Sequence, residues 1–231
     1  SIIDVDESLP YVLEFCENGF AGIYPCNNYD LVGHIDLTTL GGNSGNDCWG
    51  WTDPSSGKEY ALMGLNTGTS FIDISDLEFP RIVGFLPTHT TNSSWRDIKT
   101  YGNYAFIVSE ASGHGMQVFD LTKLGEIAVG TSPVNFTEDA HYAGFGDAHN
   151  IVINDSQGYA YAVGTNTYNG GPHFVDISNP LNPVAAGGYG EDAYSHDAQV
   201  VTYNGPDNDY TGREILIGSN QNEVVIVDVT D

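Results

Sequence analysis

Trp95–Leu124 reads WRDIKTYGNYAFIVSEASGHGMQVFDLTKL, and this stretch decides the fold. It predicts three short strands, at Asp97–Thr100, Tyr104–Val108 and Met116–Asp120. β-Branched and aromatic runs bounded by Gly, Asn and Ser clusters are typical of short antiparallel strands. A tight turn joins the first two strands, and the polar loop Glu110–Gly115 joins the second to the third. The stretch therefore predicts one antiparallel unit.

The same unit recurs along the chain, and the third strand of each copy ends in a similar phrase. These phrases are FIDIS from Phe71, VFDLT from Val118, FVDIS from Phe174 and IVDVT from Ile226. Their aspartates are spaced by 47, 56 and 52 residues, at Asp73, Asp120, Asp176 and Asp228. A four-stranded antiparallel unit repeating at this period predicts an all-β fold, a β-propeller with about four blades present. We expect the aspartates to accept hydrogen bonds in the turns that follow their strands.

The repeat also sets the domain organisation. The units lie near residues 46–86, 95–136, 148–190 and 196–231, so residues 29–231 are expected to be propeller blades. A further strand is predicted at Asp30–Leu37, and residues 1–28 are interpreted as an irregular N-terminal leader. The last unit lacks a fourth strand of its own. The strand at Asp30–Leu37 could supply it and close a ring of four blades, or the four blades could belong to a larger propeller.

Composition restricts the possible partners. The chain has 31 acidic and 6 basic residues, for a formal net charge of −25. Nucleic-acid binding requires clustered Lys and Arg, so we exclude a nucleic-acid partner, and an anionic membrane surface is disfavoured for the same reason. No apolar run approaches the roughly 20 residues that a membrane span requires.

Three sequons and the cysteines point to the secretory pathway. The sequons begin at Asn92, Asn135 and Asn154, and we expect Asn92 and Asn154 to be exposed. Cys16 and Cys26 flank a short loop and could form a disulfide in an oxidising compartment. Cys48 is then left over and is interpreted as a small buried hydrophobe. We therefore expect an extracellular or cell-surface glycoprotein.

Polar side chains gather where ligands of propellers bind. In a propeller, the start of each blade's first strand and the loop between its second and third strands lie on the same face, at one mouth of the central channel. The candidate ligand-binding residues at these positions are Asn46, Asp47, Arg96, Asp97, Glu110, His114, His149, Asn150, His196 and Asp197. The alternative is that these side chains cap the strand starts by bonding to neighbouring backbone, with Arg96 paired to Asp97 or Glu110.

A metal could bind on the same face. His149, His196 and Asp197 are candidate ligands for a transition metal, because imidazole and carboxylate suit Zn²⁺ and similar ions. Ca²⁺ held by carboxylates and carbonyls is the oxygen-rich alternative, and no cofactor is assigned with certainty. The sequence contains no phosphate-binding fingerprint and no diagnostic nucleophile motif, so no catalytic residue is assigned.

Longer phrases resemble a known family. GNDCWGWTDP, SSWRDIKTYGNYAFIVSEASGHGMQVFDLT and SHDAQVVTYNGPDNDYTGREI are similar to LVIVD-repeat proteins of the choice-of-anchor B family, and the similarity covers Cys26 to Asp231. The resemblance implies a secreted or surface propeller without a well-established activity. It also implies about three further blades, so we expect this chain to be truncated within a roughly seven-bladed propeller. Gly188, Val200 and Leu216 stand where some members are expected to carry cysteine.

These observations favour a binding or assembly scaffold rather than an enzyme. The expected partner is a protein or glycan at the cell surface or in an extracellular assembly. Two alternatives remain: a metal-assisted hydrolase or lyase that uses the same face, and a structural subunit of an extracellular filament or matrix.

Overall fold

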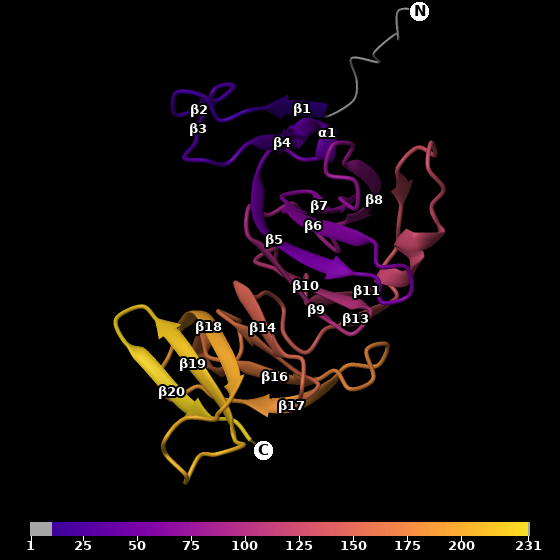
Figure 1. The fold of residues 1–231 in the computed structure, drawn as a ribbon. Helices are drawn as coiled ribbons and strands as arrows, with labels where there is room; N and C mark the ends of the chain where they lie inside the picture. The colour runs from indigo at the N-terminus through magenta and orange to yellow at the C-terminus, as the bar shows by residue number, and fades with distance from the viewer. Residues whose placement is uncertain (1–10, 231) are drawn as a thin grey trace, which may run out of the picture.

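The computed structural model describes residues 11–230, and four antiparallel sheets make up most of it (Figure 1). Sheet I contains β5 (Gly45–Thr52), β6 (Glu59–Leu65), β7 (Gly68–Asp73) and β8 (Arg81–Pro87). Sheet II contains β9 (Arg96–Tyr101), β10 (Tyr104–Ser109), β11 (Met116–Asp120) and β13 (Ala140–Tyr142). Sheet III contains β14 (Asn150–Asn154), β15 (Tyr159–Val163), β16 (His173–Asp176) and β17 (Val184–Gly188). Sheet IV contains β18 (Ser195–Thr202), β19 (Glu214–Asn220) and β20 (Val224–Asp228).

The all-β class predicted from the sequence is confirmed, and each predicted repeat unit supplies one sheet. Short 3-10 helices interrupt the connections at η1 (Leu121–Glu126) and η2 (Tyr168–Gly170). The repeated aspartates take the predicted role in turns. The backbone N–H two residues later donates to each of them at 2.9–3.1 Å, in the pairs Asp73–Ser75, Asp120–Thr122, Asp176–Ser178 and Asp228–Thr230.

The N-terminal segment is more ordered than predicted. Strand β1 (Tyr11–Glu14) pairs with β4 (Leu31–Gly33), and β2 (Phe20–Ala21) pairs with β3 (Tyr24–Pro25). An irregular leader is predicted over residues 1–28, and this is wrong where β1, β2 and β3 form; residues 1–10 lie outside the described part. A disulfide joins Cys16 and Cys26, whose Cα atoms are 5.9 Å apart.

The strand predicted at Asp30–Leu37 is also wrong over most of its length. Within this range only β4 forms a strand, and the short helix α1 (Leu37–Leu40) begins at the end of the predicted strand. Asp36 causes this change, because its carboxylate accepts the N–H of Thr39 at 2.9 Å and caps the helix. Strand β4 pairs with β1 and does not complete sheet IV.

The second unit extends beyond its predicted end at residue 136. Its fourth strand is β13, and the segment before it contributes β12 (Val134–Asn135), which pairs in parallel with β8 of sheet I. Gly84 makes this approach possible, because a Cβ there would lie 2.6 Å from the carbonyl oxygen of Val134. Phe136 then packs against Phe71 and Phe119, so the connection covers the junction of sheets I and II.

Side chains alternate along each strand, so sheets II and III each have one face toward the preceding sheet and one toward the following sheet. Phe71 of sheet I and Phe119 of sheet II stack with their ring centroids 4.7 Å apart. Val118 points the other way and packs in the cluster between sheets II and III, and Phe174 packs in the cluster between sheets III and IV. Each large side chain buried in this way contributes about 1.5–3 kcal/mol.

The outer face of sheet IV is open, whereas the N-terminal segment partly covers the outer face of sheet I. Ile226 occupies the position in sheet IV that Phe71 occupies in sheet I, yet it is 70% exposed, and Val224 is 68% exposed. On sheet I, the face turned away from sheet II borders an apolar cavity of about 410 Å³ whose lining includes Cys48 and Met63. Cys48 is exposed there, so its interpretation as a buried hydrophobe is wrong.

Candidate functional site

The first strands of the four sheets, β5, β9, β14 and β18, lie next to one another in sequence order. Polar side chains at their starts connect each strand to the next. Asn46 accepts the N–H of Arg96 at 2.9 Å, and Asp47 accepts the N–H of Ile98 at 3.2 Å. Sheets I and II are therefore joined by side chain to backbone hydrogen bonds at the predicted mouth of the channel.

The same kind of bond joins the later sheets. Asp97 Oδ2 accepts the N–H of Ile151 at 2.7 Å, and Asn150 Nδ2 donates to the carbonyl oxygen of His196 at 2.9 Å. Asn46, Asp47, Asp97 and Asn150 thus have the backbone-capping role that the sequence left as an alternative. Their contacts leave them little freedom to bind a ligand.

Asp97 is buried and lies beside a second carboxylate. Its Oδ1 accepts from Lys99 Nζ at 2.5 Å, and Lys99 lies 3.5 Å from Asp47. Burial, together with the neighbouring Asp47 carboxyl, raises the pKa of Asp97 to about 7. Lys99 therefore forms ion pairs with both Asp97 and Asp47. Because the pKa of Asp97 is near 7, the charge at this junction of sheets I and II changes with pH around neutrality.

Arg96 and His114 form a second buried pair. Arg96 Nε donates to the carbonyl oxygen of Leu65 at 3.0 Å, and its Nη1 lies 3.0 Å from His114 Nε2. The expected ion pair of Arg96 with Asp97 or Glu110 is therefore wrong, because Asp97 pairs with Lys99 and Glu110 turns toward His149.

The contacts of His114 assign its tautomer. Nε2 must accept from the guanidinium of Arg96, so Nδ1 carries the proton and donates to the carbonyl oxygen of Gly115 at 3.0 Å. Burial and the charge of Arg96 lower the pKa of His114 to about 4, so the ring is neutral near pH 7. Both side chains are fully buried, which removes Arg96 and His114 from the accessible ligand-binding set.

A smaller group remains accessible, and we call Trp95, Glu110, His149 and His196 the imidazole face. His149 Nδ1 lies 2.6 Å from Glu110 Oε1. The rings of His149 and His196 have centroids 4.3 Å apart, and Trp95 lies 5.7 Å from His149. Trp95 is 49% exposed. Side chains from sheets II, III and IV are therefore brought together.

Asp197 does not join the two histidines in a cluster of metal ligands. Its Oδ1 accepts the N–H of Ala198, the next residue in its own strand, at 2.7 Å. Within residues 11–230, one group of three His, Cys, Asp or Glu side chains has ligand atoms all within 4.8 Å of one another, and it consists of His89, Glu138 and His141.

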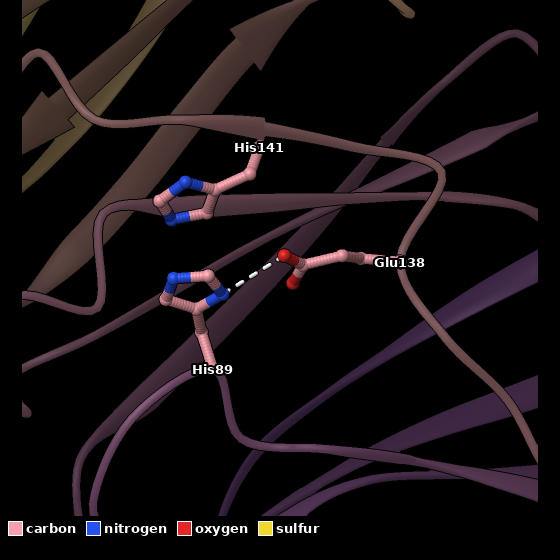
Figure 2. Close-up of side chains that lie close together, drawn as sticks. All are labelled: His89, Glu138 and His141. Carbon is pink, nitrogen blue, oxygen red and sulfur yellow. Dashed lines mark hydrogen bonds and ion pairs between the residues drawn. The ribbon is translucent and has the colours of Figure 1, made fainter.

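Sequence reasoning missed this group. His89 lies in the segment after β8, and Glu138 and His141 lie 49 residues or more further on, at the edge of sheet II (Figure 2). No local spacing links them, and a search limited to strand starts and the loops between second and third strands omits the outer connections. Their proximity follows from the packing of sheet II against sheet I.

Comparisons with known proteins concern the fold alone. No family model and no curated protein matches the chain. A hydrazine synthase structure from Kuenenia stuttgartiensis is similar over 74% of this chain, with 12% sequence identity and a TM-score of 0.50. This chain spans less than half of that one, 43% of its length. An endo-arabinase from Bacteroides thetaiotaomicron VPI-5482 aligns over 83% of this chain and 76% of its own, with 14% identity and a TM-score of 0.37.

In the described part of the chain, no helix has both the length and the apolar character needed to cross a membrane.

Proposed function

We propose that the four sheets are consecutive blades of a β-propeller that serves outside the cell as a binding or assembly scaffold. The order of the sheets supports this architecture, because their first strands are neighbours and each sheet packs on the next. The open face of sheet IV supports further blades, since Val224 and Ile226 are exposed where earlier sheets bury their counterparts. The chain would then be part of a propeller of roughly seven blades.

The ligand surface that we propose is the imidazole face. The observation that carries this proposal is that the polar side chains at one end of the first strands differ in burial and in their hydrogen-bond partners. Buried groups such as Asp97 and Arg96 bond to backbone of neighbouring strands. By contrast, Trp95, Glu110 and His196 are exposed, and His149 is half-buried beside them. An exposed tryptophan beside hydrogen-bonding groups is typical of recognition surfaces, because its ring offers a large contact area at low entropic cost.

A binding role agrees with the contacts of Ser109, the serine that precedes Glu110. Ser109 is buried and donates its proton to the carbonyl oxygen of Trp95 at 2.8 Å, so it is not placed as a nucleophile. The partner we propose is an extracellular protein or glycan. The excess of acidic residues favours a partner with a neutral or basic surface. The Cys16–Cys26 disulfide suits an oxidising extracellular compartment.

Binding to arrays of extracellular glycans and immobilised matrix proteins tests this function. We expect Trp95→Ala and the double variant His149→Ala/His196→Ala to weaken binding at least about tenfold, or about 1.4 kcal/mol. Tyr210→Ala is the matched control, because Tyr210 is an exposed aromatic residue in the loop between β18 and β19. Binding unchanged in both variants would refute the placement of the site. Turnover of a bound substrate that is lost in the same variants would favour an enzyme.

A further inference from the structure

His89, Glu138 and His141 meet at the outer junction of sheets I and II (Figure 2). His89 follows the last strand of sheet I, while His141 lies within β13, the edge strand of sheet II. This group is separate from the imidazole face and has no part in the function proposed above. Its three side chains are accessible or half-buried.

We propose that His89, Glu138 and His141 bind a first-row transition metal of the zinc class. Two imidazoles and one carboxylate form a donor set that Zn²⁺ accepts, with the fourth position left for water or another ligand. The hard cations Ca²⁺ and Mg²⁺ prefer sites made of oxygen alone, so the two imidazoles select against them. The ligand atoms already lie within 4.8 Å of one another. Bonds of about 2.0–2.2 Å to a tetrahedral ion require separations of roughly 3.5 Å, a change that side-chain rotation can supply.

The carboxylate is held in place by a buried side chain. Gln117 Nε2 donates to Glu138 Oε2 at 2.7 Å and to the carbonyl oxygen of Pro87 at 3.0 Å. Gln117 is only 2% exposed, so its orientation is fixed by its surroundings. Because this bond occupies Oε2, Glu138 Oε1 is left for the metal. Partners of this kind orient ligands in metal sites.

A backbone carbonyl fixes one of the histidines. His141 Nε2 lies 2.7 Å from the carbonyl oxygen of His114, so Nε2 carries the proton and Nδ1 has the free lone pair. A carbonyl acceptor on the nitrogen opposite the metal is the usual support for a histidine ligand. Two of the three proposed ligands are therefore oriented by neighbouring groups.

Binding of the metal requires His89 to change its orientation. His89 Nδ1 forms a hydrogen bond with Glu138 Oε1 at 2.8 Å, and the rings of His89 and His141 stack with centroids 3.7 Å apart and planes 10° apart. Lone pairs of parallel rings do not converge on one point, so His89 must turn to bind the ion. It is the exposed member of the group and can do so. The metal would replace the hydrogen bond to Glu138.

The cluster borders a space that could admit a further ligand of the metal. A cavity of about 280 Å³ lies beside it, and its lining includes Leu86, Gln117, Phe136, His89 and Glu138. Because His89 follows the last strand of sheet I, and the other two ligands lie in or next to the edge strand of sheet II, the bound ion would also join the two sheets. Metal binding should therefore stabilise the fold, which gives a readout independent of any activity.

The purified chain, treated with chelator and dialysed, is titrated with Zn²⁺ by calorimetry and with Co²⁺ by visible absorption. We expect one equivalent to bind, a tetrahedral Co²⁺ spectrum and a Zn²⁺-dependent rise in Tm. Glu138→Gln keeps the shape of the side chain and should still fold, while losing a ligand charge. Loss of a residue that only orients a metal ligand lowers metal affinity roughly 10–100-fold. Glu138→Gln and His141→Ala each change a ligand itself, so each should lower the Zn²⁺ affinity by more than this.

His34→Ala is the matched control, because His34 is an exposed histidine in the N-terminal segment. It should leave the titrations unchanged. Absence of binding and of any Tm shift in the unmodified chain would overturn the proposal. So would binding that survives Glu138→Gln and His141→Ala but is lost in His149→Ala, since the metal would then belong to the imidazole face.

Discussion

Asp97 on β9 accepts the backbone N–H of Ile151 on β14 at 2.7 Å, so a carboxylate of sheet II satisfies a donor of sheet III. Asp47 does the same one repeat earlier, for Ile98. A buried N–H without a partner is costly, and at these two junctions an aspartate side chain supplies an acceptor for it. The first strands can therefore lie side by side although they belong to separate sheets.

Asp97→Ala should destabilise the chain far more than Asp197→Ala. The first change leaves the buried N–H of Ile151 without an acceptor, which costs about 1–3 kcal/mol. Among the described residues, exposed Asp197 accepts from Ala198 in its own strand, so its loss should cost no more than about 0.5 kcal/mol. Urea denaturation followed by circular dichroism measures both. Equal losses would contradict a connecting role for Asp97.

Asp97→Asn should change how stability depends on pH. The pKa of Asp97 is about 7 in the folded chain, above its ordinary value near 3.9, so the folded state holds the proton more tightly. Its contribution to stability is present below about pH 4 and is lost as pH rises to about 7. The unfolding free energy of the unmodified chain minus that of Asp97→Asn should fall across this window. If this free-energy difference rose with pH instead, the pKa of Asp97 would be lowered by folding, and the proposed pH dependence would be refuted.

His114 should act in the opposite direction. Its pKa in the folded chain is about 4, below the ordinary value near 6.5, so the unfolded state binds the proton more tightly. The resulting stability is present above about pH 6.5 and is lost as pH falls through about 4. The glutamine in His114→Gln does not titrate, so the unfolding free energy of this variant should fall less between pH 7.0 and pH 4.5 than that of the unmodified chain. Urea denaturation at pH 4.5, 5.5 and 7.0 measures this. His34→Gln is the exposed control and should leave the profile unchanged.

Phe71→Ala and Ile226→Ala compare equivalent positions of sheets I and IV. Phe71 is fully buried against Phe119, and its truncation should cost about 3–5 kcal/mol. Ile226 is 70% exposed, so its truncation should change the stability of this chain by no more than about 0.5 kcal/mol. Thermal and urea denaturation of both variants provide the measurement. A loss near 2 kcal/mol for Ile226→Ala would mean that another surface covers sheet IV in solution.

The three sequons should differ in glycan occupancy when the chain is produced through a eukaryotic secretory pathway. Asn92 and Asn135 are exposed and available. Asn154 is half-buried, contrary to the expectation from its turn, and its Nδ2 donates to Thr202 Oγ1 at 2.9 Å across to sheet IV. Peptide mass spectrometry should therefore find glycans at Asn92 and Asn135 and an unmodified Asn154. Full occupancy of Asn154 would show that its bond to Thr202 is not maintained during folding.

Much of the fold could be predicted because its signals are local. The phrase around Asp120 predicts a strand and the turn that ends it, and both are present. The predicted strands are wrong where a helix cap or a pairing with a strand of another unit decides the local structure. Asp36 caps α1 where a strand was expected, and β12 leaves its own unit to pair with β8.

The candidate site was only partly predictable. The sequence places several polar groups at the starts of neighbouring strands. It does not show which of them form hydrogen bonds to the backbone of the next strand and which remain exposed. Asp97 and Arg96 are buried between sheets, whereas His149 is half-buried and His196 is exposed. Burial depends on the packing of one sheet on the next, which no single repeat contains.

The sequence by itself determined the strands, the turns and their repetition, because alternation and turn chemistry act over a few residues. Only the tertiary structure decided which side chains meet. Glu110 of sheet II contacts His149 of the adjacent sheet III, and His89 contacts Glu138, which lies 49 residues further along the chain. Such contacts depend on the angle and distance between packed sheets, and these are set by the large side chains buried between them.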